Sequence, residues 1–138
     1  MRLPLSCAIV AVICLAGCRG HELNTAPVRG TVTLDGKPLA RGTVIFTPTQ
    51  GRSANGRIQS DGSFNLSTYG DGDGAIVGSH KIAVYEAPVE REPGKFDVDR
   101  PQLPAKIPEL YRDPDRSGLS FDVQADEENV ASLELQSR

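Results

Sequence analysis

Short segments in which apolar and polar residues alternate recur along most of the chain, and turns containing glycine, aspartate or proline separate them. Successive side chains of a strand point to opposite faces, so this alternation is typical of strands that are buried on one face. No window keeps a 3.6-residue apolar period over three turns, which argues against a helical domain. The pattern predicts an all-β fold, a sandwich or a barrel, with seven strands at 28–34, 43–47, 53–59, 64–67, 80–85, 119–124 and 131–135.

The same alternation predicts which side chains face the core. In the segment 80–85, we expect Ile82 and Val84 to point inward. Lys81 and Ala83 are expected to point to solvent. The acidic run 126–128 follows the strand 119–124 and is expected to form the last hairpin turn.

The N-terminus has the three-part pattern of a secretory signal peptide. Arg2 supplies a positive charge, an apolar stretch follows, and Ala16 and Gly17 are the small residues that precede Cys18. A cysteine in this position is similar to the lipid-attachment site of bacterial lipoproteins. That resemblance implies cleavage after residue 17 and acyl chains, palmitate among them, on the sulfur and the new amino group of Cys18. Arg19 follows where an aspartate would favour the inner membrane, so the resemblance implies the outer membrane of the cell envelope.

Two other interpretations of this segment are a membrane-spanning helix and a plain signal peptide. A membrane-spanning helix needs about 20 apolar residues, whereas only sixteen residues separate Arg2 from Arg19. A plain signal peptide with an incidental cysteine is the second alternative. Cys7 and Cys14 would leave with the signal, so the mature chain would keep one cysteine and form no internal disulfide.

The remaining chain is long enough for one domain. Residues 18–26 are expected to be the lipidated cysteine and a polar tether, and residues 27–136 the folded domain. Loss of Arg2 reduces the 15 basic residues to 14 against 18 acidic ones, with both signs interspersed. Nucleic acid is therefore not an expected partner, because phosphate binding requires a concentrated positive face.

Several motifs together resemble carboxypeptidase-regulatory-like domains, which are small transthyretin-like β-sandwiches. The motifs, in chain order, are 30–39 (GTVTLDGKPL), 42–46 (GTVIF), 61–64 (DGSF), 70–75 (GDGDGA), 78–82 (GSHKI), Tyr111, 117–119 (SGL) and Asn129. The resemblance implies a seven-stranded transthyretin-like β-sandwich over 27–136. It also implies a non-catalytic role, because such domains accompany metallocarboxypeptidases as accessory modules without a zinc site, or occur as envelope lipoproteins.

A long proline-rich segment, 86–114, interrupts the pattern of strands. Six prolines make it unsuitable for a central strand, and connections of this length in a compact domain are usually either binding loops or mobile ones. Both interpretations remain open. Phe96 stands among charged residues in this segment and is the candidate contact with a partner.

Motifs of catalysis are absent from the sequence, and neither an enzyme nor a cofactor is expected. The chain has no G-x-S-x-G and no H-E-x-x-H, and His80 is interpreted as an ordinary surface residue. Asp71 and Asp73 are candidate calcium ligands, because two carboxylates on a glycine-rich backbone can face one cation. The rest of the calcium-loop pattern fails, so a plain turn is the favoured interpretation of these residues.

These observations predict a lipid-anchored, non-catalytic envelope lipoprotein that acts as a binding or assembly module. Its partners would be the lipid bilayer, through Cys18, and an envelope protein or a glycan. Three alternatives remain: a carbohydrate-binding module, an unrecognised hydrolase that uses His80, and a structural coat component.

Overall fold

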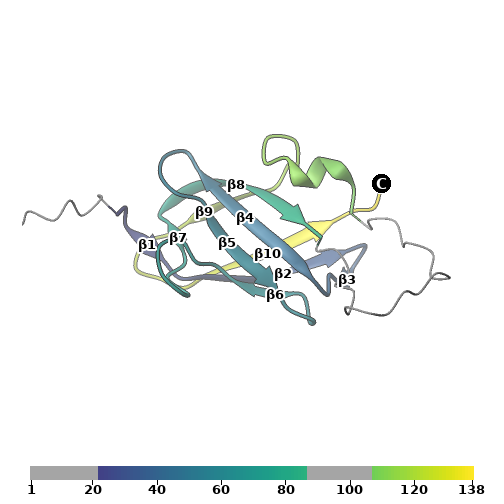
Figure 1. The fold of residues 1–138 in the computed structure, drawn as a ribbon, viewed down its shortest axis with the longest axis horizontal. Helices are drawn as coiled ribbons and strands as arrows, with labels where there is room; N and C mark the ends of the chain where they lie inside the picture. Colours follow the sequence, from purple (N-terminus) through teal and green to yellow (C-terminus); the bar gives the residue numbers. More distant parts are fainter. Residues whose placement is uncertain (1–21, 87–106) are drawn as a thin grey trace, which may run out of the picture.

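The computed structural model describes residues 22–86 and 107–138, and within these ranges the protein is all-β (Figure 1). The sequence-based prediction of fold class is therefore confirmed at this level. The elements are β1 (Thr25–Ala26), β2 (Val28–Leu34), β3 (Lys37–Pro38), β4 (Gly42–Pro48), β5 (Ala54–Ile58), β6 (Ser63–Asn65), β7 (Ala75–Ile76), β8 (Gly78–Tyr85), the 3₁₀ helix η1 (Glu109–Arg112), β9 (Ser120–Val123) and β10 (Asn129–Leu135). The alternation pattern did not predict the two-residue strands β1, β3 and β7.

Two four-stranded sheets form a sandwich-like arrangement. One sheet has the order β10-β2-β3, with β6 also paired to β2, and the other has the order β5-β4-β8-β9. All pairs are antiparallel except β10 and β2, which run parallel from Asn129 beside Val28 to Leu135 beside Leu34. The expectation that the acidic run 126–128 forms a hairpin turn is therefore wrong. The run carries the chain from β9 in one sheet to β10 in the other.

The core lies between the two sheets and follows the alternation of the sequence. Every second residue of β10, from Asn129 to Leu135, is buried, and β5 alternates in the same way. Phe46 lies at the centre, with its ring 6.2 Å from that of Phe64 on the facing sheet and 6.0 Å from that of Phe121. Burial of apolar side chains from both sheets is the main driving force for this packing.

One side of the sandwich is closed by contact between β5 and the segment around β6. Asn55 and Ser67 exchange two backbone hydrogen bonds, and the Gln59 nitrogen donates to the Ser63 oxygen 2.8 Å away. Between these points Gly56 approaches the other sheet, and a Cβ at this position would lie 2.5 Å from the Asn65 backbone oxygen. We refer to this junction, 55–59 against 63–67, as the β5–β6 seam.

The N-terminal end of the described chain belongs to the fold rather than to a tether. Thr25 and Ala26 of β1 pair with β7, and Ala26 is only 2% exposed. The Leu23 nitrogen donates a hydrogen bond to the Tyr69 hydroxyl oxygen at 3.1 Å. The expected boundary at residue 27 is therefore corrected to before Thr25, because a two-residue strand is too short to produce a detectable alternation.

The opposite side of the sandwich is covered by residues 107–119. This segment includes η1, which contacts β8, and the buried Tyr111 of η1 contacts the residue that follows β10. The C-terminal part of the predicted loop 86–114 is thus ordered structure, starting with Ile107, which is 3% exposed. Ala83 is also buried, contrary to the expected outward orientation, on the strand that η1 contacts.

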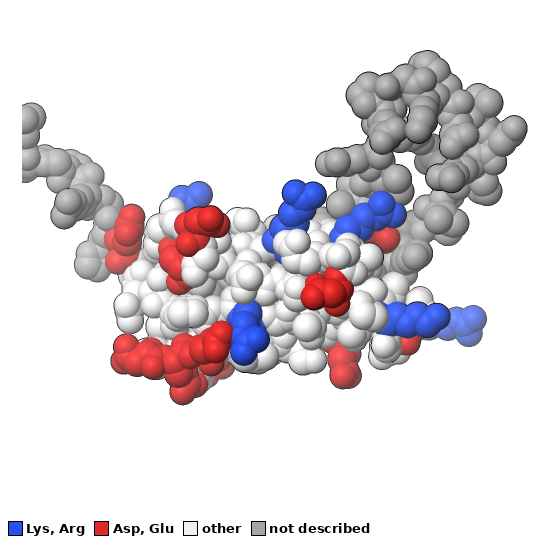
Figure 2. All heavy atoms as spheres, turned by 90° about the horizontal axis from the view of Figure 1, so that it is seen from below, with Lys and Arg blue, Asp and Glu red and all other residues white. Residues whose placement is uncertain are grey.

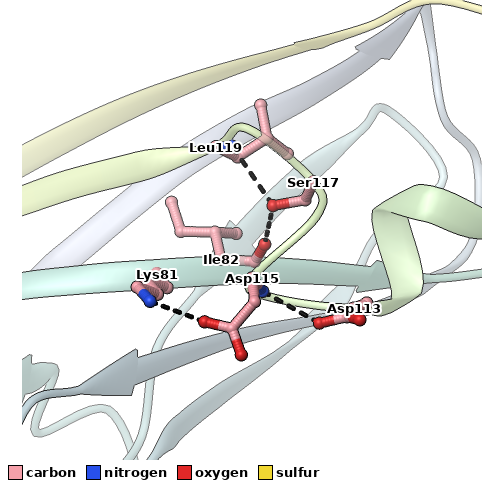
Figure 3. Close-up of polar contacts among 6 residues, drawn as sticks. All are labelled: Lys81, Ile82, Asp113, Asp115, Ser117 and Leu119. Atoms are coloured by element: carbon pink, nitrogen blue, oxygen red, sulfur yellow. Dashed lines mark hydrogen bonds and ion pairs between the residues drawn. The ribbon is translucent and has the colours of Figure 1, made fainter.

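Polar contacts hold this segment on β8 (Figure 3). The Ser117 hydroxyl donates to the Ile82 oxygen at 2.5 Å and accepts from the Leu119 nitrogen at 3.1 Å. The Lys81 ammonium group lies 2.5 Å from the Asp115 carboxylate. That ion pair is exposed and contributes little to stability, whereas the buried serine satisfies two backbone groups that would otherwise lack partners.

The sandwich has two distinct ends. β1 and β7 lie at one end, where β8 begins, and β8 then runs its full length to Tyr85 at the other (Figure 1). Eight residues of strand span about 23 Å at about 3.3 Å per residue. We call these ends the β1 end and the Tyr85 end.

Candidate functional site

Two of the residues singled out from the sequence lie outside the described ranges. These are Cys18, the expected lipid-attachment site, and Phe96, the expected contact with a partner. Along the sequence, the nearest described strand is β1 for Cys18 and β8 for Phe96. The prediction for each residue stays a prediction.

The candidate calcium ligands Asp71 and Asp73 lie in one loop, and the carboxylate of Asp73 is already bonded to the backbone of that loop. The Asp73 carboxylate accepts hydrogen bonds from the backbone nitrogens of Thr68 at 2.7 Å, Gly70 at 2.9 Å and Tyr69 at 3.0 Å. Burial raises the pKa of this carboxyl, but the three hydrogen bonds together outweigh it, so the pKa lies below its ordinary value of 3.8. Asp73 thus organises a turn, and Asp71 is exposed beside it.

His80 is buried, which corrects its interpretation as a surface residue. Its side chain is 2% exposed, and its ring centroid lies 5.8 Å from that of Phe46. Nε2 lies 2.6 Å from the Ile76 carbonyl oxygen and donates to it, while Nδ1 has no hydrogen-bond partner among the described residues. The alternation placed His80 on the same face as Ile82 and Val84, and this register carries it into the core.

A polar groove of about 570 Å³ lies over the β5–β6 seam. Its floor is the outer face of the strands, since the inward-facing residues of β5 and β6 belong to the core. The polar residues that line it are Arg29, Asn55, Arg57, Gln59, Asn65, Ser67, Asp71 and Glu128.

The strand register places these side chains in two rows across the seam. Asn65 pairs with Arg29 across β6 and β2, and the register of the seam sets Asn65 opposite Arg57. Asn55 and Ser67 form the neighbouring row. Adjacent strands lie about 4.8 Å apart, so Asn65 stands between the positions of the two arginines.

The groove residues differ in whether they already have partners. The Arg29 guanidinium forms an ion pair with Glu128 at 2.6 Å, and the Ser67 hydroxyl accepts the Gly72 backbone N–H at 2.8 Å. In the described part of the chain, the side chains of Asn55, Arg57 and Asn65 make no hydrogen bond or ion pair. These three exposed side chains are therefore free to bind a ligand.

Charge is distributed unevenly over the face of the molecule seen in Figure 2. Acidic side chains gather most densely at one end, and lysine and arginine side chains lie over the middle and toward the other end. The acidic connection 124–128 joins Val123, which pairs with Gly78, to Asn129, which pairs with Val28. It therefore belongs to the β1 end, while Arg57 lies further along the seam.

Sequence reasoning did not single out Arg57, Asn55 or Asn65. Each was visible only as the outward residue of a short alternating segment, which is the ordinary position for polar side chains. Their juxtaposition depends on β5 meeting β6 across the short connection 59–62, so the turn pair Asp61-Gly62 was the signal that could have found it.

The fold and the groove define a sandwich-like all-β domain with a polar surface site. No family model matches the chain, and neither the curated proteins nor the solved structures contain a match to it. Across 22–86 and 107–138, no helix is long and apolar enough to span a membrane. The same residues contain no cluster of three or more potential metal-ligating side chains.

Proposed function

We propose that the protein is a lipid-anchored, non-catalytic lipoprotein of the cell envelope, with a seven-stranded core related to carboxypeptidase-regulatory-like, transthyretin-like domains. Acylated Cys18 attaches it to the membrane, with the outer membrane as its location. The domain then acts as a binding or assembly module for another envelope component.

The separation of the two ends of the sandwich is the observation that carries this proposal. β1 is the first strand after the lipid-attachment site and lies at one end of the sandwich (Figure 1). The segment that contains Phe96 follows β8, which ends at the opposite, Tyr85 end. Only a few residues separate Cys18 from β1, and each spans at most about 3.6 Å. A sandwich attached in this way presents its Tyr85 end away from the bilayer.

The charge of the β1 end supports the same orientation. Glu22, Asp71 and the run 126–128 give this end an acidic surface, which anionic lipid headgroups repel. The domain is then held near the membrane by its lipid alone and stays free to meet a partner. Two acyl chains suffice for durable attachment, since each buried CH₂ contributes about 0.8 kcal/mol.

The environment of His80 supports a non-catalytic role. General base catalysis requires a side chain within hydrogen-bond reach of a substrate proton. His80, the one histidine within the described residues, is enclosed by the core and donates to the Ile76 oxygen.

Anchoring is tested by replacing Cys18 with serine. The expected result is loss of radiolabelled palmitate incorporation and release of the protein from carbonate-washed membranes. A Cys14→Ser variant is the control and should remain attached. Retention of Cys18→Ser in washed membranes would overturn the anchoring proposal.

The binding role is tested by photo-crosslinking in cells from position 96, with exposed Ser132 on β10 as the control position. A single partner captured from position 96 and not from 132 is expected. Equal or absent capture from both positions would contradict a role of this segment in partner binding.

A further inference from the structure

We propose that the groove over the β5–β6 seam binds a carboxylate-bearing oligosaccharide, with Arg57 holding the carboxylate and Asn55 and Asn65 bonding the hydroxyls. The inference rests on the proposed function, because it assigns a ligand class to a binding module. It concerns side chains of β2, β5 and β6 and does not involve Phe96.

The free polar groups of the groove match this ligand. The Arg57 guanidinium carries five N–H donors in a planar fork that fits a carboxylate in two parallel hydrogen bonds. The side-chain amides of Asn55 and Asn65 each offer both a donor and an acceptor, as a sugar hydroxyl also does. None of the three has to break an interaction within the described residues before it binds.

The position of the acidic residues orients the ligand. Glu128 is neutralised by Arg29, but Asp71 lies exposed near Ser67 and Gly72, on the row of Asn55. A carboxylate is repelled there and attracted to Arg57 on the neighbouring row, about two residues further along β5. The sugar carboxylate therefore lies at the Arg57 side of the groove and the neutral hydroxyls toward Asn55.

The composition of the groove favours a saccharide over a peptide. Its apolar lining consists of Pro27 and Val28 together with two glycines, so it has no deep pocket for an apolar side chain. One edge of β5 pairs with β4 and one edge of β6 pairs with β2, and their other edges face each other across the hydrogen bonds of the seam. These described strands therefore offer no free edge that a peptide could extend. A hydroxyl-rich ligand needs neither feature.

The size and lining of the groove indicate a modest affinity for the saccharide. A volume of about 570 Å³ lies within the usual range for small-molecule sites, about 300–1,000 Å³. Among the described residues, those that line the groove include no aromatic ring on which a sugar could stack. Charge-assisted hydrogen bonds to Arg57 therefore supply most of the discrimination.

The test uses isothermal titration calorimetry of the full chain in detergent micelles with two probes, tetragalacturonate and the uncharged galactose tetrasaccharide. We expect saturable binding of the acidic probe at least tenfold tighter than binding of the neutral one. Arg57→Gln should abolish that preference. Asn65→Ala should weaken binding of both probes, and thermal unfolding should show that both variants remain folded.

The matched control is Arg112→Gln, which removes an exposed arginine outside the groove. It should leave the affinity for tetragalacturonate unchanged. Equal losses for Arg57→Gln and Arg112→Gln would reveal non-specific attraction, and absence of saturable binding at millimolar concentrations would also overturn the proposal. Because the titration does not depend on the lipid, saccharide binding by Cys18→Ser separates a failure of anchoring from a failure of this site.

Discussion

The hydroxyl oxygen of Tyr111 lies 2.9 Å from the backbone nitrogen of Gln136 and accepts its hydrogen bond. This contact joins η1 to the residue that follows β10, across 25 positions of sequence. Odd-numbered residues of β10 bond to β2, starting with the Asn129 nitrogen and the Pro27 oxygen, so the Gln136 nitrogen points to the outer edge of the strand. Tyr111 covers that end of the edge and closes the sandwich beside β8.

Removing this hydroxyl should therefore loosen the end of β10 without disturbing the core. For Tyr111→Phe we expect a loss of about 0.5–1.5 kcal/mol in the free energy of unfolding, the usual net contribution of one hydrogen bond. Amide hydrogen exchange should accelerate at Gln136 and not at Leu133. Tyr85→Phe is the control, because its hydroxyl donates to the Arg112 oxygen at an exposed site and should cost less. Unchanged exchange at Gln136 would contradict the assigned role of Tyr111.

Of the polar side chains between η1 and β9, Ser117 should be the one whose replacement lowers the free energy of unfolding most. Ser117→Ala removes the donor to the Ile82 oxygen and the acceptor for the Leu119 nitrogen, both in a buried setting. We expect urea unfolding to show a loss of about 1–3 kcal/mol, the cost of unsatisfied buried polar groups. Ser120→Ala, at an exposed position of β9, should change stability by less than about 0.5 kcal/mol. Similar values for the two variants would contradict this account.

Loss of the side-chain N–H donors of Asn129 should destabilise the fold. Its side-chain nitrogen donates to the carbonyl oxygens of Pro27, Gln124 and Glu127, and its side-chain oxygen accepts the Gln124 backbone N–H. Asn129→Asp places a carboxylate against three carbonyl oxygens and should cost at least about 2 kcal/mol at neutral pH.

The deficit of Asn129→Asp should narrow at acidic pH, because a protonated carboxyl can donate again. Thermal unfolding across the pH range measures both effects. Gln136→Glu makes the same chemical change at an exposed position and is expected to be nearly neutral. A deficit that does not depend on pH would contradict the assigned donor role.

Asp73 should contribute a component of acid sensitivity. Its pKa is lowered in the folded protein by hydrogen bonds from Thr68, Gly70 and Tyr69 that outweigh the effect of burial. A carboxyl with a lowered folded-state pKa stabilises the fold above its unfolded-state pKa, and this contribution is lost as the pH falls through the folded-state value. Asp73→Asn should be less stable than the wild type at neutral pH and should lose less stability below about pH 4.

Chemical unfolding at closely spaced pH values measures this difference. Asp71→Asn is the matched control, because the exposed carboxylate two residues earlier organises no turn. It should retain the acid dependence of the wild type. Parallel pH profiles for Asp73→Asn and the wild type would rule out the assigned contribution.

Local alternation was informative wherever a strand buries one face. It correctly predicted that Ile82 and Val84 of β8 point inward, because the period of two follows from backbone geometry alone. It was wrong for Ala83, since the segment that contains η1 covers the outer face of β8 and removes the solvent that the pattern assumed. His80 was misjudged for a different reason, because a polar residue type was given more weight than its position in the alternation.

Of the candidate sites, one was predictable from the local sequence and another was not. The turn at Asp73 was predictable, because aspartate and glycine in close succession favour local hydrogen bonds to the backbone. The groove as a whole was not predictable, because Arg29 and Glu128 approach Asn65 only through the pairing of β2 with β6 and an ion pair between residues distant in sequence. Cys18 and Phe96 remain predictions from the sequence.

The sequence by itself determined that this chain forms strands and which side chains most of those strands bury. Both properties are local, since each follows from alternation within five to seven residues. Only the tertiary structure decided that β10 runs parallel to β2, that β2 pairs with β6, and that residues 107–119 cover one side of the sandwich. Those contacts join residues distant in sequence, and their free energy depends on how complete faces fit together rather than on any single segment.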